Sequence, residues 1–154
     1  MNENLIKLTN QLKERGIKFR LIELKDRAIT VEDVVKFSKE DIKPEQICKT
    51  LIVKTNKGYV GVFLKGDKKI NLDRLRGVLN SKVNLANLEE VKEASGVERG
   101  AVCPLLLDIP LVMDEEVLDL ERVNFGSGDC LYGIEMKPED ILKLKEVKVF
   151  KISD

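Results

Sequence analysis

The chain has 154 residues, of which 43% are apolar and 35% charged, so its composition excludes a disordered chain. Its 27 basic residues balance 27 acidic ones, which excludes a broad basic surface for duplex nucleic acid and leaves room only for a local contact. It has no histidine, the commonest general base and metal ligand. We expect one domain over residues 1–154 that folds without a partner.

The N-terminal segment is predicted to form two helices around one strand. Leucines recur at helical spacing from Leu5 to Leu12, and Gly16 follows where a helix favours a left-handed residue. Residues 19–23 favour a short strand. Thr30, followed three residues later by Asp33, indicates a capped second helix.

The next segment reads as a short helical turn and a β-hairpin. Pro44 suits the first turn of a helical segment. Residues 50–55 and 59–64 are rich in β-branched and apolar side chains, and the turn signal Asn-Lys-Gly separates them. The hairpin therefore begins next to Lys49.

Two further helices are predicted from their caps. Asn71 precedes a helix over 72–79, and Asn87 precedes a helix that ends at Gly96, with a brief strand over 83–85 between them. Beyond residue 101 the pattern returns mainly to strands. The expected strands are 102–107, 111–113, 121–125, 131–135 and 147–152, and a helix is expected over 138–144.

This order of elements predicts an α+β fold. Hairpins mix with scattered helices, and no βαβ unit repeats, so we expect a mixed, mostly antiparallel sheet or a barrel-like core with surrounding helices. No internal repeat or low-complexity segment is present.

Three segments stand out as candidates for chemistry: Cys48-Lys49-Thr50-Leu51, then Gly100-Ala101-Val102-Cys103-Pro104, and Gly126-Ser127-Gly128. Their order, together with Lys137-Pro138-Glu139-Asp140, resembles the YbaK and ProX family of freestanding aminoacyl-tRNA editing proteins, from about Ile42 to the last residue. Each piece is weak alone, but the ordered set is specific. The resemblance implies an aminoacyl-tRNA deacylase, which hydrolyses the ester at the 3′ end of mischarged tRNA.

The resemblance implies roles for particular residues. An isolated lysine is usually exposed to solvent, but family membership implies that Lys49 points into the editing pocket and holds the terminal phosphate or polarises the ester. Gly126, Ser127 and Gly128 are expected to be catalytic, since their backbone N–H groups can bind an oxyanion or orient water, although a plain hairpin turn explains the glycines equally well.

The remaining predicted site residues bind substrate. They are Thr50, Gly100, Ala101, Val102, Pro104 and Asp129. For Gly100 and Pro104 an ordinary turn is an equal alternative. Ala101 stands where the family more often has glycine, Cys103 where it has serine, and Asp129 where basic residues are frequent, so the edited amino acid stays open.

Two other readings of the chemistry are weaker. Cys103 and Cys130 lack an activating partner, so they read as small buried apolar side chains rather than nucleophiles. The acidic run Asp114, Glu115 and Glu116 reads as a solvated helix cap rather than a metal site. No metal or cofactor is expected, and the group that activates water is not identified; the resemblance allows the substrate's own ribose hydroxyl or amino group.

The expected partner is the acceptor end of an aminoacyl-tRNA, with a synthetase or translation factor as a further candidate. No apolar run reaches the ~20 residues of a membrane span, and the first residues lack a signal-peptide pattern, so we expect a cytoplasmic protein with no membrane contact. The competing hypothesis is a non-catalytic module on the same fold that binds aminoacyl-tRNA, a nucleotide or a protein.

Overall fold

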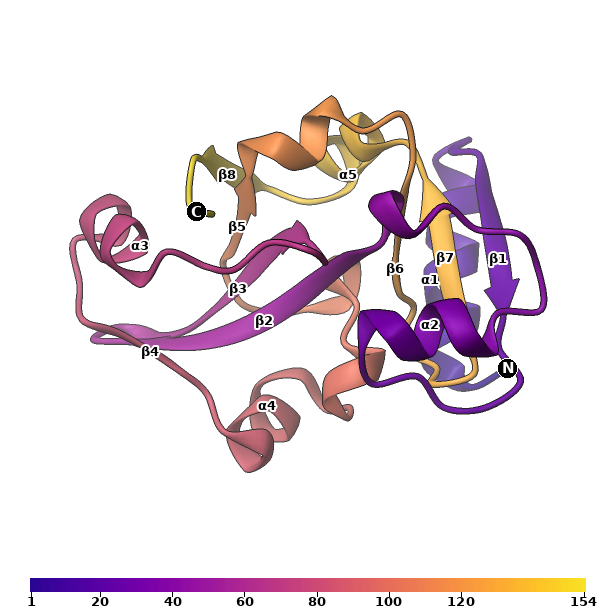
Figure 1. The fold of residues 1–154 in the computed structure, drawn as a ribbon, viewed down its shortest axis with the longest axis horizontal. Helices are drawn as coiled ribbons and strands as arrows, with labels where there is room; N and C mark the ends of the chain where they lie inside the picture. The colour runs from indigo at the N-terminus through magenta and orange to yellow at the C-terminus, as the bar shows by residue number, and fades with distance from the viewer.

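The computed structural model describes residues 1–154 and confirms the α+β prediction (Figure 1). The strands are β1 (Phe19–Glu23), β2 (Cys48–Thr55), β3 (Gly58–Lys65), β4 (Val83–Leu85), β5 (Leu111–Asp114), β6 (Val123–Gly126), β7 (Tyr132–Met136) and β8 (Val147–Phe150). The helices are α1 (Glu3–Glu14), α2 (Val31–Phe37), α3 (Leu72–Leu79), α4 (Leu88–Ser95) and α5 (Pro138–Leu144).

The strands form two open sheets. One has three antiparallel strands in the order β1-β7-β6, and the other has five in the order β4-β2-β3-β5-β8. In the larger sheet β3, β5 and β8 run parallel, and the other pairs are antiparallel. The prediction of a mixed, mostly antiparallel arrangement is therefore confirmed, whereas the barrel-like alternative was wrong because neither sheet closes on itself.

The main core lies between the two sheets. It joins Phe63 of β3 and Phe125 of β6, whose rings meet edge to face at 5.4 Å, and it includes residues of α1, α4 and α5. Val60, Val62 and Leu64 of β3 point to the other face of the sheet, where they pack with Leu75 of α3. This two-sided burial fixes the register of the β2–β3 hairpin.

A smaller apolar cluster holds α2 against the outer face of the three-stranded sheet. Ile22, Leu24 and Ala28 are its buried members, and Val34 and Phe37 of α2 are only partly buried upon them. No residue of α2 is fully buried. The helix thus lies as a thin cover beside β1 (Figure 1).

Most predicted element ends are confirmed by their caps. Thr30 and Asp33 form a reciprocal capping box at α2, and Asn87 with Glu90 does the same at α4. Gly16 and Gly96 adopt positive φ after α1 and α4. The strands expected over 121–125, 131–135 and 147–152 are present as β6, β7 and β8, with ends displaced by one or two residues.

The strand predicted over 102–107 was wrong. The segment forms a short 3₁₀ turn at Pro104–Leu106 instead. Pro104 has no N–H to donate to a sheet, and the apolar side chains of Val102, Cys103 and Leu107 enter the main core from a non-strand backbone. An apolar run alone does not distinguish these cases.

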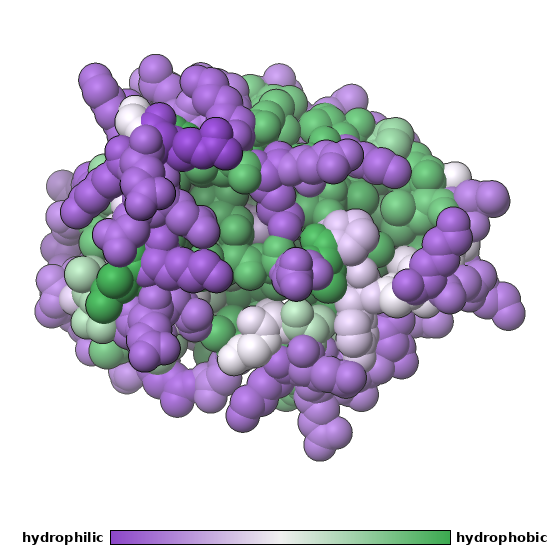
Figure 2. All heavy atoms as spheres, turned by 180° about the vertical axis from the view of Figure 1, so that it is seen from behind, coloured by the Kyte–Doolittle hydropathy of each residue, from purple (hydrophilic) through white to green (hydrophobic).

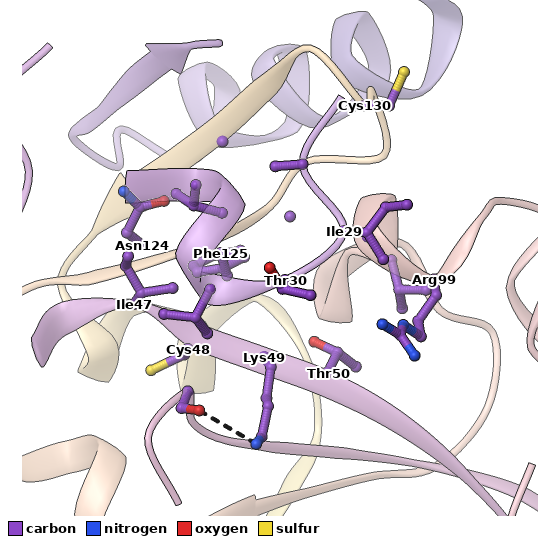
Figure 3. Close-up of a pocket in the computed structure, with 18 of the residues that line it drawn as sticks. Ile29, Thr30, Ile47, Cys48, Lys49, Thr50, Arg99, Asn124, Phe125 and Cys130 are labelled. Atoms are coloured by element: carbon purple, nitrogen blue, oxygen red, sulfur yellow. Dashed lines mark hydrogen bonds between the residues drawn. The ribbon is translucent and has the colours of Figure 1, made fainter. Parts of the chain in front are cut away.

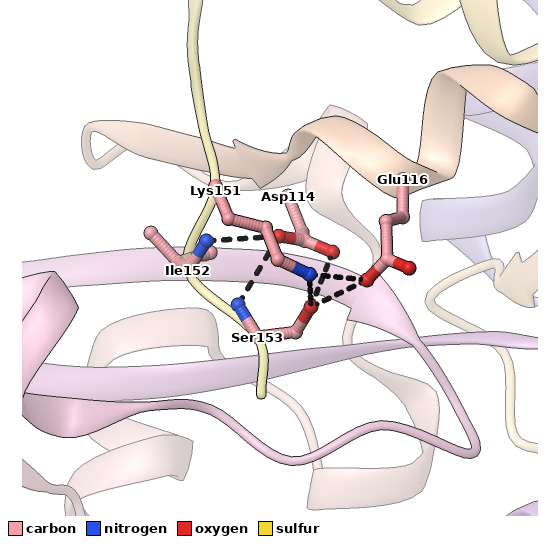
Figure 4. Close-up of polar contacts among 5 residues, drawn as sticks. All are labelled: Asp114, Glu116, Lys151, Ile152 and Ser153. Atoms are coloured by element: carbon pink, nitrogen blue, oxygen red, sulfur yellow. Dashed lines mark hydrogen bonds and ion pairs between the residues drawn. The ribbon is translucent and has the colours of Figure 1, made fainter.

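The solvated cap predicted for Asp114 was also wrong. Asp114 is fully buried; its Oδ1 accepts hydrogen bonds from the N–H groups of Ile152 and Ser153 at 2.9 and 3.2 Å. Glu116 pairs with Lys151 at 2.7 Å and lies 2.7 Å from the Ser153 hydroxyl (Figure 4). The acidic run therefore anchors the C-terminal segment beside β5.

We expect Asp114→Ala to lower the free energy of unfolding by about 3 kcal/mol, because two buried N–H groups lose their acceptor. Urea unfolding followed by circular dichroism measures the loss. Glu115→Ala is the matched control, since Glu115 is exposed and the change should stay within about 0.5 kcal/mol. Equal effects of the two variants would refute the anchoring role.

No helix is long and apolar enough to cross a bilayer. The face opposite to that of Figure 1 carries hydrophilic side chains around much of its edge, with apolar residues between them (Figure 2). Leu88, the first residue of α4, is the most exposed large apolar side chain, followed by Met1 and Leu85, which is a modest apolar surface for a chain of this size.

Candidate active site

A cavity of about 410 Å³ lies where α2 and the start of β2 meet two glycine-containing loops (Figure 3). The parallel bridge between Ile47 and Asn124 joins the two sheets beside it. The predicted site residues that line it are Lys49, Thr50, Gly100, Val102, Gly126 and Asp129. Residues from four separate parts of the chain thus meet in one hollow.

Lys49 lies at one side of this cavity, half-buried. Its Nζ donates a hydrogen bond to the backbone oxygen of Gly66 at 3.3 Å (Figure 3). Burial lowers the pKa of Lys49, while the nearby carboxylates of Asp67 and Glu32 act in the opposite direction. The ammonium group makes no ion pair within 4 Å, so part of its hydrogen-bonding capacity is left for an anionic ligand.

Thr50 follows Lys49 on β2 and is 8% exposed. Its Oγ1 is buried and has no hydrogen-bond partner in the protein. Arg99 lies on the same side of the cavity (Figure 3), is exposed and forms no ion pair, whereas the adjacent Glu98 is paired with Arg27. A buried hydroxyl group therefore lines the cavity together with two cationic side chains, those of Lys49 and Arg99.

Gly100 and Gly126 allow three backbone segments to approach closely. A Cβ atom at Gly100 would lie 2.1 Å from the oxygen of Ala28, and one at Gly126 would lie 2.5 Å from the oxygen of Val102. Both glycines therefore shape the cavity wall by backbone packing, and neither has positive φ.

Ser127 and Gly128 do not line the cavity. The Ser127 hydroxyl is fully buried and donates to the backbone oxygen of Tyr132 at 2.7 Å, and the Gly128 N–H donates to Ala101 at 2.9 Å. The Gly128 carbonyl accepts hydrogen bonds from the side chains of Asn2 and Asn4 at the start of α1. These groups hold the loop against α1, and their catalytic role stays a prediction.

Asp129 lines the cavity but its carboxylate is already engaged. Oδ2 accepts from the Asn2 N–H at 2.9 Å and Oδ1 from the Leu131 N–H at 3.1 Å. Ala101 and Pro104 are buried and do not line the cavity. Of the predicted substrate-binding residues, Thr50, Gly100, Val102 and Asp129 therefore line the cavity.

The cysteines differ in their environments. Burial raises the pKa values of Cys48 and Cys103 to about 12, so both thiols stay protonated at neutral pH. Cys130 is partly exposed and lines the cavity near its edge. The prediction of a small buried apolar side chain is confirmed for Cys103 and was wrong for Cys130, which is not buried.

Residues 26–144 match the family described as the aminoacyl-tRNA editing domain. The chain belongs to this family. A proline–tRNA ligase of Caldicellulosiruptor saccharolyticus is 31% identical to the editing domain over 126 residues, which cover 81% of this chain and 21% of that enzyme. One of Kosmotoga olearia is 33% identical over 111 residues, which cover 70% of this chain and 18% of the enzyme. The chain therefore spans about a fifth of the length of these curated relatives.

Solved structures resemble the editing domain over its whole length. The hypothetical protein APE2540 superposes with a TM-score of 0.84 at 29% identity, covering 96% of this chain and 99% of the other. A proposed trans-editing enzyme for prolyl tRNA synthetase superposes with a TM-score of 0.85 at 21% identity, covering 100% and 99% of the two chains. At 21% identity, the similarity to this second structure shows a shared fold and nothing more. The family and fold expected from the motifs are thus confirmed.

Several cavity residues were absent from the sequence prediction. They are chiefly Ile29, Thr30, Arg99 and Asn124. Arg99 had a usable signal, since it is a basic residue directly before a predicted glycine loop. Asn124 had none, because an asparagine inside a strand gives no indication of which face it occupies or of what lies opposite.

Proposed function

We propose that this editing domain hydrolyses the ester bond of mischarged aminoacyl-tRNA in the cavity beside Lys49. The observation that carries the proposal is the convergence of Lys49, Thr50, Gly100 and Gly126 on one cavity, in a chain of the editing family. A synthetase gains only about 1 to 3 kcal/mol from one methylene group, so a second hydrolytic pocket is needed for small amino acids.

The two cations at the opening bind the nucleotide end of the substrate. Lys49 has a compact ammonium group already positioned by Gly66, and Arg99 offers a planar guanidinium that suits a phosphate. The Thr50 hydroxyl, without a protein partner, lies beside them for the terminal ribose or the ester. Cationic groups aimed at developing negative charge stabilise the tetrahedral transition state.

The chain supplies no evident general base. The carboxylates that line the cavity belong to Glu32 and Asp129, and both oxygens of Asp129 accept backbone hydrogen bonds. Glu32 is exposed on α2. We therefore assign removal of the water proton to the substrate itself, through the terminal ribose hydroxyl or the amino group, while the protein positions the ester.

The partner in this proposal is the single-stranded acceptor end of a charged tRNA in the cytoplasm. Net charge is zero, so binding depends on the few cations near the cavity and weakens with salt. The curated relatives are proline–tRNA ligases, which makes tRNA for proline the first substrate to test.

The test is the release of labelled amino acid from a panel of correctly and incorrectly charged tRNAs, including alanyl-, cysteinyl- and seryl-tRNA for proline. We expect release from at least one mischarged member and none from prolyl-tRNA. Binding of the panel without release from any member would refute the deacylase and favour the non-catalytic binding module.

A further inference from the structure

Two buried polar side-chain atoms in the protein lack a hydrogen-bond partner, Thr50 Oγ1 and Asn124 Nδ2. Both residues line the same cavity. Folded proteins satisfy nearly all such atoms, because an unpaired buried donor costs about 1 to 3 kcal/mol. Their presence together in one hollow indicates that a ligand supplies the missing partners.

Asn124 lies in the part of the cavity away from the cations. It is 2% exposed, and Figure 3 shows it on the opposite side from Arg99, with Phe125 and Thr30 between them. Ile47, whose backbone bridges that of Asn124, lies beside it, and the apolar residues Leu24 and Val34 also line the cavity. Asn124 carries the one side-chain amide among the residues that line the cavity.

The fold makes specific room for this amide. A Cβ atom at Gly133 on β7 would lie 2.9 Å from Asn124 Oδ1, so a larger residue there would displace the side chain. The bridge between Asn124 and Ile47 fixes the backbone at the same point. The amide therefore lies close against Gly133, and its Nδ2 is left to donate.

We propose that Asn124 determines substrate specificity and selects an acyl group with a side-chain hydroxyl, serine or threonine. This inference rests on the proposed function. With the phosphate held beside Lys49 and Arg99, the acyl side chain extends toward Asn124. A hydroxyl oxygen accepts from Nδ2, an alanyl methyl group cannot, and a thiol sulfur accepts weakly. A cavity of about 410 Å³ lies toward the small end of ligand pockets, which favours small acyl groups.

The test compares two nonhydrolysable analogues, adenosine 5′-phosphate carrying a 3′-amide-linked seryl or alanyl group, by calorimetry. We expect the wild type to bind the seryl analogue about 10- to 100-fold more tightly, the range for one buried hydrogen bond. Asn124→Leu should bring the two affinities within threefold of each other, and Asn124→Ala provides a second, smaller replacement. Asn84→Leu, on the exposed face of β4, is the control that keeps the wild-type ratio.

Thermal unfolding gives an independent readout. Because the free protein buries an unpaired amide, Asn124→Leu should not lower the melting temperature, whereas loss of a structural hydrogen bond would. Equal affinity of the wild type for both analogues, or an unchanged ratio in Asn124→Leu, overturns the inference even if deacylation of other tRNAs is observed. Preferential binding of the seryl analogue without hydrolysis of any tRNA would support the inference about Asn124 and would refute only the proposed deacylase activity.

Discussion

Lys49→Met is expected to reduce kcat/KM for deacylation about 10²- to 10³-fold, the usual effect of removing one electrostatic contact to a transition state. Methionine keeps a similar length and an apolar stem, so the half-buried site remains filled, but the charge and the donor to Gly66 are lost. The measurement is single-turnover release of amino acid from the best substrate of the panel.

Lys57→Met is the matched control for this prediction. Lys57 is exposed in the turn between β2 and β3, on the same hairpin but not in the cavity lining, and its replacement should leave the rate within twofold. Circular dichroism and urea unfolding should show both variants folded. A Lys49→Met protein that is folded and fully active would exclude Lys49 from the reaction.

Gly100→Ala and Gly126→Ala are expected to destabilise the protein by about 3 kcal/mol each, at the upper end for overpacking. The new Cβ atoms would lie 2.1 and 2.5 Å from backbone oxygens, which cannot move as a flexible side chain can. Relief of the overlap requires the loops that form the cavity wall to separate. Deacylation should therefore fall together with the melting temperature.

Gly77→Ala provides the opposite expectation with the same chemical change. Gly77 is exposed within α3, and no heavy atom lies within 4 Å of its added Cβ. Alanine is the better helix former, so we expect a gain of about 0.5 to 1 kcal/mol. If Gly100→Ala and Gly77→Ala had equal effects in urea unfolding, close packing of the loops would not explain the glycines.

Local signals in the sequence were sufficient for most of the fold. Caps such as Thr30 and Asn87 act over three residues, and the hairpin around Gly58 has its own turn chemistry, so these elements were predictable. The segment 102–107 failed because burial of an apolar run says nothing about its backbone. The prediction of a barrel-like core failed for a similar reason, since barrel closure depends on long-range strand pairing that no local pattern encodes.

In the candidate site, only the residues that belong to the family's sequence motifs could be predicted. Lys49, Thr50, Gly100 and Gly126 line one cavity, and the roles that the resemblance implies for them stay predictions. Ser127 and Gly128 belong to the same motif, yet their groups contact Tyr132 and α1, which depends on the docking of the chain's first residues. The polar side chain of Asn124 becomes significant only when its lack of a partner is seen.

The central claim is that the cavity beside Lys49 holds the charged 3′ end of tRNA. A crystal structure with a 3′-amide-linked aminoacyl adenosine 5′-phosphate tests it most directly. We predict the phosphate within about 3 Å of Lys49 Nζ and the acyl group in the same cavity, extending toward Asn124. An analogue bound elsewhere on the surface, with the cavity occupied only by water, would contradict the account.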